Sequence, residues 1–565
     1  MNRSKTSQIT FLFLCVLLYL TYPVLGQPIS WTNPNTGVSA GDWTDASNWS
    51  TLSVPTSNNN AQINNGGEAV ISSNIEASRI EIGRNGGFGS VTSEATDIEI
   101  IVDSDLDIGE IGGSFASGAI VVMGEGSATI SNAAHLLIGE SGAGDLDLGQ
   151  TNATSGAEAT GVGSLTLNNV ALVQVVDDAD IGQADGSATA NANGSLFVNS
   201  VADFQIGLDL DLGQAGGAGQ SSGVGLTTIE NSQVTIGVNA DIGRSTGSLL
   251  GNSGNGTLTA VDSTVSIGFA DALQPGSLNI GDVGASIDLH GSGSGAVIIE
   301  RSTLTVADNI NVGGLSGGSE SLSNTSNGSL TLINSLAEAA DVVVANIAST
   351  TAGDVSGSLV LDASLLTIDG VLDLGTNATV SFELAGTTRA DGSGAEEQYA
   401  AIDALSAILS GNLEVSLEES FTPVAGDQFD LITSTGLISN SFDIVTLPTL
   451  TANLEWNIVQ TDSLFRLEVI SGDIDADFDQ DGDVDGTDFL SLQRSLGTSS
   501  GASRSQGDAD LDGDVDQVDL DLWESNFGQN LVSPSISSVP EPATLSVLTL
   551  GMLLLPRRIR RSAHQ

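Results

Sequence analysis

Short segments in which apolar and polar residues alternate recur through most of the chain, and each begins at a glycine. The pattern Gly-x-apolar-x-apolar is typical of a β-strand with one buried face, because successive side chains of a strand point to opposite sides. Its glycines are separated by 37, 37, 31, 31, 31, 39, 33 and 29 residues. They are Gly89, Gly126, Gly163, Gly194, Gly225, Gly256, Gly295, Gly328 and Gly357. A strand pattern that returns at a nearly fixed interval predicts stacked repeats.

Each repeat continues with Asn or Asp at a turn, a second alternating segment, and a third segment that ends in an aliphatic residue and Gly. The third segments contain Asp180-Ile181-Gly182, Asp211-Leu212-Gly213, Asp241-Ile242-Gly243, Asn279-Ile280-Gly281, Asn311-Val312-Gly313 and Asp373-Leu374-Gly375. We therefore predict a mainly β protein whose body is a right-handed parallel β-helix, a solenoid of about 31-residue repeats with coils about 4.8 Å apart. An array of β-sandwiches is the alternative.

Aromatic residues lie on both sides of the repeats. Trp31, Trp43 and Trp49 precede them and Trp456 follows them. Such residues suit caps over the exposed end coils, so we predict an N-terminal cap at 27–88, solenoid repeats at 89–375 and a C-terminal β cap at 376–470. The layout resembles autotransporter-type passenger proteins with β-strand repeats, which implies an exported structural or adhesive body.

Charge and composition narrow the range of partners. The chain has 70 acidic and 14 basic residues, a net charge of −56, and only 4% aromatic residues. Such a field repels a phosphate backbone, so we predict no nucleic-acid binding and expect metal cations as ligands. The single cysteine, Cys15, lies in the first apolar run, which excludes disulfides and zinc–thiolate sites from the rest of the chain.

The N-terminal segment has the order of a secretory signal. Arg3 and Lys5 precede an apolar run from about Ile9 to Leu20, and Gly26 follows a polar-to-small exit. We predict a signal peptide at 1–26, with a retained membrane anchor as the alternative.

The C-terminal segment has the order of a different targeting signal. Pro540-Glu541-Pro542 precedes the apolar stretch Leu545–Leu555, and Arg557, Arg558, Arg560 and Arg561 follow it. This order resembles the PEP-CTERM sorting signal, here at 539–561 after a linker at 529–538. The resemblance implies a short C-terminal hydrophobic helix, membrane contact only through this tail, processing by an exosortase-type enzyme, and association with the cell envelope and extracellular polysaccharide. A plain hydrophobic tail is the alternative.

Residues 473–528 repeat an acidic loop template 31 residues apart. Aspartates stand at positions 1, 3, 5, 7, 9 and 12, with Gly482 or Gly513 at position 6. Calcium takes six to eight oxygen ligands and needs Gly at the sharp turn, so the template predicts two Ca²⁺ sites. Amphipathic segments that begin at Phe489 and Leu520 then predict short helices that end at Gly497 and Gly528. The predicted metal residues are Asp477, Asp479, Asp481, Asp483, Asp485 and Asp488, and Asp508, Asp510, Asp512, Asp514, Asp516 and Asp519.

The paired loops and helices resemble a type I dockerin, a calcium module that docks onto cohesin domains. The resemblance assigns side-chain ligation to positions 1, 3, 5 and 12 of each loop, backbone carbonyls to Asp483 and Asp514, and water-mediated contacts to Asp485 and Asp516. It implies a cohesin-like partner and a module that is unfolded without metal. Calcium as a local staple without any partner is the alternative.

Carboxylates two apart on one strand, as in Asp103-Ser-Asp105-Leu-Asp107, Asp145-Leu-Asp147 and Asp209-Leu-Asp211, would suit a glycoside hydrolase or a calcium-dependent polysaccharide lyase. The column Asp180, Asp211, Asp241 recurs once per repeat, however, which favours a solvated face or a cation ladder over a catalytic group. We therefore predict an exported, envelope-associated structural or adhesive protein with calcium-dependent docking, and no enzyme. The alternative is a carbohydrate-active β-helix enzyme carried by a dockerin.

Overall fold

The computed structural model describes residues 28–37, 40–113, 121–153, 158–246, 251–269, 275–284, 290–316, 324–347, 353–393, 395, 397–451, 454–471, 476–509 and 513–529. The predicted signal peptide at 1–26, nearly all of the predicted linker and the predicted sorting signal with its hydrophobic helix lie outside these residues. The chain divides into a large unit that extends to Leu450 and includes Trp456–Val469, and a small C-terminal unit.

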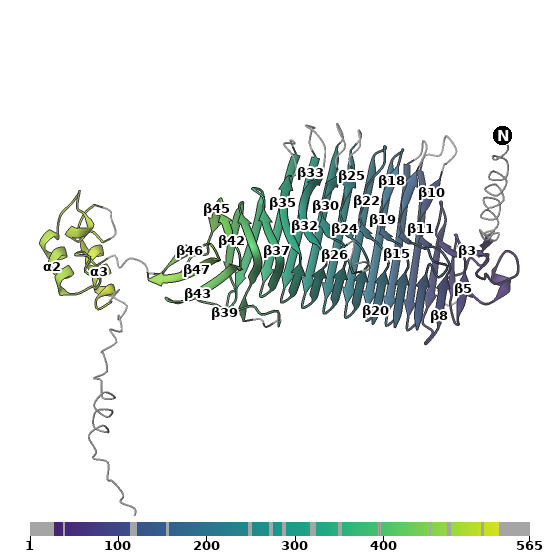
Figure 1. Ribbon diagram of the computed structural model, residues 1–565, viewed down its shortest axis with the longest axis horizontal. Coiled ribbons are helices and arrows are strands. Elements are labelled where there is room, and N and C mark those ends of the chain that lie inside the picture. Colours follow the sequence, from purple (N-terminus) through teal and green to yellow (C-terminus); the bar gives the residue numbers. More distant parts are fainter. Residues whose placement is uncertain are drawn as a thin grey trace, which may run out of the picture. The chain divides into compact units, whose positions relative to one another are not determined.

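The large unit is a parallel β-helix, in which strands of successive coils pair in register along the stack (Figure 1). The predicted repeat is confirmed at every glycine, because Gly89 pairs with Gly126, Gly126 with Gly163, and so on to Gly328 with Gly357. The strands therefore stack as one continuous helix and not as separate sandwiches. The right-handed sense of the coil stays a prediction, as do the boundaries of the predicted domains.

Three walls make up each coil. The first wall comprises β2 (Gly41–Asp42), β4 (Asn65–Val70), β7 (Phe88–Ser93), β11 (Val121–Ser131), β15 (Glu158–Asn168), β19 (Ala190–Asn199), β22 (Ser221–Glu230), β26 (Asn252–Val261), β30 (Gly291–Glu300), β33 (Asn324–Ile333), β36 (Gly353–Asp362), β38 (Ala378–Leu384) and β42 (Asn412–Leu417), with β39 (Thr388–Arg389), β40 (Gln398–Tyr399) and β45 (Ile444–Thr446) near its end.

The second wall comprises β5 (Ile75–Ala77), β8 (Glu99–Val102), β12 (His135–Ile138), β16 (Leu172–Val175), β20 (Asp203–Ile206), β23 (Gln233–Ile236), β27 (Thr264–Ile267), β31 (Thr303–Val306), β34 (Leu336–Ala339), the first half of β37 (Leu365–Leu374) and the first half of β41 (Ala401–Leu409). The second half of β41 pairs with the second half of β37 and continues the third wall.

The third wall comprises β1 (Ile29–Ser30), β3 (Asn60–Ile63), β6 (Arg79–Ile82), β9 (Leu106–Ile108), β13 (Leu146–Leu148), β17 (Ala179–Ile181), β21 (Leu210–Leu212), β24 (Ala240–Ile242), β28 (Leu278–Ile280), β32 (Asn309–Ser316), β35 (Asp341–Ile347) and the second half of β37. Short strands follow it at β10 (Ile111–Gly113), β14 (Thr151–Ala153), β18 (Ala184–Gly186), β25 (Ser245–Thr246) and β29 (Val283–Gly284).

Glycine and leucine divide the interior of a coil into a narrow and a wide part. Along β15, Gly161, Gly163, Leu165 and Leu167 face inward. A Cβ atom on Gly163 would lie 2.0 Å from the carbonyl oxygen of Ile108, so the walls touch there and only glycine fits. The leucines fill the wider part with Val173, Val175 and Ile181, which are all buried. The glycine that begins each repeat thus marks the contact between walls.

The turn between the first and second walls uses a left-handed residue in most coils. Asn132, Asn169, Asn231, Asp262 and Asn334 have φ between 48° and 59°. Asn and Asp tolerate this region better than other residues with a side chain, which explains why the sequence places them there.

The two ends of the solenoid differ from its middle. Trp31, Trp43 and Trp49 are buried and pack edge to face, with ring centroids 4.8 and 4.9 Å apart. At the other end β43 (Gln428–Ser434) pairs in antiparallel fashion with β47 (Leu464–Ser471), close in sequence to β44 (Ile438–Asn440) and β46 (Leu454–Gln460). An antiparallel strand interrupts the parallel register on which further coils would stack.

The small unit contains α2 (Gly486–Ser495) and α3 (Gln517–Asn526). Both helices begin three residues before the predicted amphipathic segments, because Asp485 and Asp516 cap them and form capping boxes with Asp488 and Asp519. Across the described residues, none of the helices has the length and hydropathy needed to cross a membrane. The likeness to a dockerin stays a prediction.

Candidate functional sites

Acidic side chains converge in two places, the paired loops of the small unit and one column of the solenoid. In the first loop, carboxylate oxygens of Asp477, Asp479 and Asp488 lie within 4.8 Å of one another. Those of Asp483, Asp485 and Asp488 form a second such group. The second loop brings Asp514, Asp516 and Asp519 together in the same way. Of the remaining predicted metal residues, Asp481 accepts a hydrogen bond from the Asp483 N–H at 3.2 Å, and Asp510 and Asp512 lie outside the described residues.

The aspartate at position 12 ties each loop to its helix. Asp488 is fully buried, and its Oδ1 accepts hydrogen bonds from the N–H groups of Phe478 and Asp479 at 2.7 and 3.2 Å. Its Oδ2 accepts one from the N–H of Asp485 at 2.8 Å. Asp519 repeats this arrangement with Ala509 and Asp516, at 2.6 and 2.7 Å. Each carboxylate oxygen has two lone pairs, so Asp488 can hold the loop and also ligate a cation.

The aspartate at position 1 has one buried oxygen without a donor. Asp477 Oδ2 accepts a hydrogen bond from the N–H of Gly482 at 3.1 Å, and Asp508 Oδ2 accepts one from Gly513 at 3.1 Å. The Oδ1 atoms of both residues are buried and have no hydrogen-bond partner, while the side chains are 8% and 2% exposed. A buried carboxylate oxygen without a donor is costly unless a cation meets it. This buried Oδ1 atom without a donor, which we call the orphan oxygen, occurs at position 1 of both loops.

The charge of the first loop also calls for a cation. Desolvation, followed by repulsion from neighbouring carboxylates, raises the pKa of Asp479 and of Asp483. An all-oxygen donor set of this kind suits Ca²⁺, since the described part of the small unit offers no Cys or His for a softer metal.

The two loops are coupled through the backbone and one core. The N–H of Val484 donates to the Gln529 carbonyl at 3.0 Å, and the Val484 carbonyl accepts from Gly528 at 2.8 Å, just after α3. Val515 makes the matching pair of bonds with Thr498 and Gly497 after α2, at 2.9 and 2.8 Å. Each loop thus rests on the end of the other loop's helix. The core below them comprises Ala476, Phe478, Val484, Leu492, Ala509 and Val515.

The second acidic site is a column in the third wall, which we call the carboxylate ladder. It comprises Glu81, Asp107, Asp147, Asp180, Asp211 and Asp241, and each residue pairs in register with the next. The column is not a fully solvated face, because Asp107, Asp147 and Asp241 are 0%, 6% and 7% exposed, although Asp180 and Asp211 are partly exposed. Side chains three residues further on, such as Glu110 and Gln150, and the neighbouring coils cover them.

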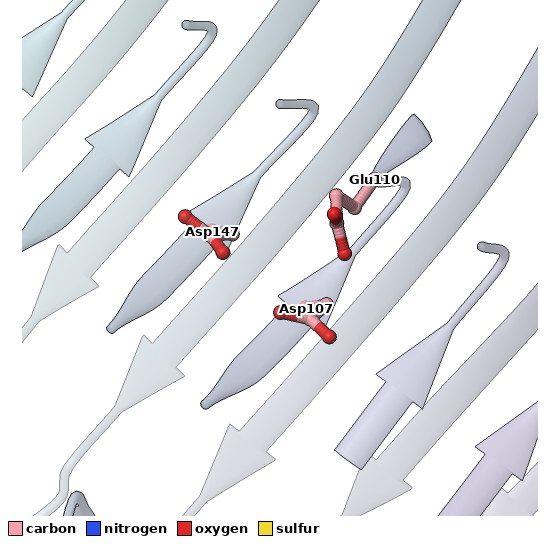
Figure 2. A group of neighbouring side chains, drawn as sticks. All are labelled: Asp107, Glu110 and Asp147. Atoms are coloured by element: carbon pink, nitrogen blue, oxygen red, sulfur yellow. The ribbon is translucent and has the colours of Figure 1, made fainter. Parts of the chain in front are cut away.

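Arginines neutralise the N-terminal end of the ladder. Asp107, Glu110 and Asp147 have carboxylate oxygens within 4.8 Å of one another and are all buried (Figure 2). Arg79 makes two hydrogen bonds to Asp107, and Arg84 Nε lies 2.8 Å from Glu110 Oε2. These guanidinium groups occupy the oxygens that a metal would need, so the group is a buried ion-pair network. Within the described chain, Asp147 is the member of this group that forms no ion pair with a basic residue.

Glutamines replace arginines along the middle of the ladder. Gln150 Nε2 lies 3.1 Å from Asp147 Oδ1, 3.0 Å from Asp180 Oδ2 and 2.9 Å from Gln183 Oε1. Gln183 Nε2 donates to Gln214 Oε1 at 2.9 Å, and Gln214 Nε2 donates to Asp211 Oδ2 at 3.2 Å. Basic charge returns only at Arg244, which pairs with Asp241 at 2.6 Å.

Burial shifts the ionisation of these aspartates. Desolvation raises the pKa of Asp180 to about 7 and that of Asp211 to about 8, and nearby carboxylates add to both shifts. Desolvation, then the charges of Asp107 and Asp180, raises the pKa of Asp147 well above its usual range. Two unit charges about 5 Å apart, the coil spacing, repel by roughly 3 kcal/mol at an effective dielectric constant of about 20.

The neighbouring aspartates considered for catalysis have structural partners. Asp145 and Asp209 each accept a hydrogen bond from a backbone N–H of the next coil, at 3.2 and 2.7 Å, as does Asp178 between them at 2.9 Å. A groove of about 570 Å³ lies at the turn between the first and second walls. Its two charged lining residues, Asp262 and Arg301, pair with each other at 2.9 and 3.0 Å, so the groove has no free carboxylate pair for hydrolysis.

Sequence reasoning missed Glu81, the arginines and the glutamines of the ladder, although a signal was present. Each ladder residue begins an acid-aliphatic-Gly-polar tetrad, as in Glu81-Ile82-Gly83-Arg84 and Asp180-Ile181-Gly182-Gln183. In the tetrads of Glu81, Asp147, Asp211 and Asp241 the fourth residue donates a hydrogen bond to the first.

Comparisons with known proteins add little. The chain matches no protein-family model and no curated protein. Among solved structures it is similar to the Haemophilus influenzae Hap adhesin, with 12% identity and a TM-score of 0.18. The similarity covers 73% of this chain and 61% of that chain, so this protein spans less than two thirds of its length. A TM-score this low carries no argument about function.

Proposed function

We propose that this protein is an exported structural or adhesive component of the cell envelope, in which an acidic solenoid serves as spacer or adhesive surface and a calcium-loaded module docks a partner. The observation that carries the calcium proposal is the repeated orphan oxygen, since Asp477 Oδ1 and Asp508 Oδ1 are both buried without a donor. One Ca²⁺ in each loop would meet that oxygen and offset the clustered negative charge.

The residues that would hold each ion follow from the loop positions. Asp477, Asp479 and Asp488 supply carboxylates to the first ion, with Asp481, the carbonyl of Asp483 and a water held by Asp485 as further ligands. The second site would use the equivalent residues, Asp508, Asp510, Asp512, Asp514, Asp516 and Asp519. Metal binding would then stabilise the module, because its small core alone buries little apolar surface.

Docking of a partner protein by the small unit is the second part of the proposal. The exposed surface of the two helices carries apolar side chains, since Leu490 and Val518 are 47% and 50% exposed. The ring centroids of Trp523 and Phe489 lie 4.7 Å apart with a tilt of 37°, and the Trp523 indole N–H donates to the Asp485 carbonyl at 3.2 Å. This surface therefore depends on the loop geometry. A cohesin-like protein is the partner that the dockerin resemblance implies, and its binding would require calcium.

Location follows from the two terminal segments, which lie outside the described residues. A signal peptide at 1–26 would direct export. A PEP-CTERM-like segment at 539–561 would retain the chain at the envelope until an exosortase-type enzyme processes it, near extracellular polysaccharide.

The proposal is tested by calorimetric calcium titration of the full chain and of the Asp477→Asn/Asp508→Asn variant. We expect two calcium ions per chain for the natural protein and strongly weakened binding for the variant. Asp521→Asn, an exposed aspartate on α3 outside the loops, is the matched control and should bind as the natural protein does. A pull-down from envelope extract with and without chelator then tests docking. Two sites with no calcium-dependent partner would contradict docking but keep the metal sites.

A further inference from the structure

We propose that the middle of the carboxylate ladder, Asp147, Asp180 and Asp211, binds protons at neutral pH, and that loss of these protons in mildly alkaline solution loosens the coils they join. The proposal is independent of the calcium module. It concerns β13, β17 and β21, three consecutive strands of the third wall, in which Asp147 pairs with Asp180 and Asp180 with Asp211.

Few side-chain hydrogen-bond donors reach the three carboxylates. An amide group has two N–H donors, yet Gln150 Nε2 lies within 3.1 Å of three acceptors, Asp147, Asp180 and Gln183. One side-chain N–H of Gln183 donates to Gln214 and not to an aspartate. A proton on a carboxyl group converts one acceptor into a donor, which restores the balance.

Basic side chains lie at the two ends of the ladder and not at its middle. All eight arginines between residues 27 and 555 are in the described part of the chain, and there is no lysine in that span. Arg79 and Arg84 pair with the acids at one end and Arg244 with Asp241 at the other. Three stacked aspartates are therefore left with amides as their closest partners.

The charged groups that face the three aspartates are almost all acidic. Asp107, Glu110 and Asp145 face Asp147. Asp178, Asp145 and Asp209 face Asp180, and Asp241 and Asp209 face Asp211. Arg244 opposes this field at Asp211. The raised pKa values of the three carboxyl groups agree with the donor count, since both favour the neutral acid.

The next two coils show the same column without a charge. Asn279 pairs with Asp241 in register, and Asn311 pairs with Asn279. Their amides form a ladder, in which Asn279 Nδ2 donates to Asp241 Oδ1 at 2.7 Å and Asn311 Nδ2 donates to Asn279 Oδ1 at 2.8 Å. A neutral acid is isosteric with the amide, so protonation gives the middle of the column the same bonding pattern.

The test is potentiometric titration of the full chain and of the triple variant Asp147→Asn/Asp180→Asn/Asp211→Asn. Because Asn already occupies the column at 279 and 311, the variant should fold, which far-UV circular dichroism checks. Between pH 6 and pH 9 we expect the natural chain to release about two to three more protons than the variant. Asp354→Asn, an exposed aspartate on β36, is the control and should release as many protons as the natural chain.

A second measurement guards against a variant that folds poorly. Infrared titration of the natural chain should show a protonated carboxyl band at pH 6 that is lost by pH 9, and the single variant Asp180→Asn should weaken it. Equal proton release in the natural chain and the triple variant would overturn the proposal. So would a protonated band that calcium removes at pH 6, because the ladder would then be a cation site.

Discussion

The paired loops and the carboxylate ladder both bring aspartates close together, but they offset the repulsion between them in different ways. Both gather aspartates closely enough to repel one another, within 4.8 Å in each loop and about one coil spacing apart in the ladder. The loop carboxylates converge on a point and leave the Oδ1 atoms of Asp477 and Asp508 without donors. The ladder carboxylates are spread along a line and contact amides and arginines. Convergent oxygens suit a metal ion, whereas a line of buried acids suits protons and fixed basic groups.

Removal of calcium should have the largest effect, because it should destabilise the small unit and leave the solenoid folded. At free calcium 1,000-fold above its dissociation constant, each bound ion would stabilise the module by about 4 kcal/mol. We therefore expect chelator to abolish the cooperative unfolding of residues 476–529 and to leave the β-sheet signal of the solenoid unchanged. Differential scanning calorimetry with circular dichroism checks both regions. A helical signal indifferent to chelator would contradict the proposed calcium dependence.

A glycine substitution in the solenoid should have the reverse effect, since it should destabilise the solenoid and leave the small unit unchanged. Gly182 has φ +75°, and a Cβ there would lie 1.8 Å from the carbonyl oxygen of Val224. Gly182→Ala should cost about 3 kcal/mol of solenoid stability, because it adds a backbone clash to left-handed strain, and it should not change calcium affinity. Gly142→Ala is the control, since Gly142 also has positive φ but nothing within 4 Å. An equal loss in both variants, measured by thermal unfolding, would show that wall contact does not matter at Gly182.

Coupling between the loops predicts a smaller effect. Val484 and Val515 bond to the segments that follow the opposite helices, so weakening one site should disturb the other. Asp477→Asn should lower calcium affinity at its own loop by about tenfold, or 1.4 kcal/mol, and at the second loop by less. Hydrogen exchange at residues 513–529 during calcium titration measures the second effect. An unchanged second loop would mean that the two sites act independently.

The pH dependence of the two regions should have opposite signs. The ladder carboxyls have raised pKa values in the folded chain, about 7 for Asp180 and about 8 for Asp211, so the folded state binds more protons than the unfolded state. Their contribution to stability is fully present below their unfolded pKa and is lost as the pH rises through 7 to 8. Calcium binding instead weakens on acidification, because protons compete for the carboxylate ligands. Unfolding temperatures and calcium titrations at pH 6 and pH 8.5 compare the two, and parallel trends would contradict the distinction.

The sequence predicts the framework of this protein better than its buried charges. The repeat is readable because wall contact demands glycine at positions such as Gly163, and the turns demand Asn or Asp at positions such as Asn169. The loops are readable because calcium geometry fixes Asp and Gly at set positions. The helix starts are missed by three residues, because the capping of Asp485 extends α2 toward the loop.

Burial of the ladder could not be predicted from strand alternation. Asp147 stands between the inward-facing Leu146 and Leu148, so the pattern places it on the outer face and predicts contact with water. Its cover comes from Gln150 in the following bend and from adjacent coils, which depends on how turns fold back against the stack. Single-strand patterns carry no information about such cover.

The most direct test of the account is hydrogen exchange of the full chain at neutral pH with calcium and with chelator. The account predicts that calcium slows exchange across residues 476–529 and leaves strands β13, β17 and β21 unchanged. Slower exchange in those strands would place a cation in the ladder, and no change in 476–529 would remove calcium from the loops. Either result would contradict the division of the two acidic regions into a metal site and a proton site.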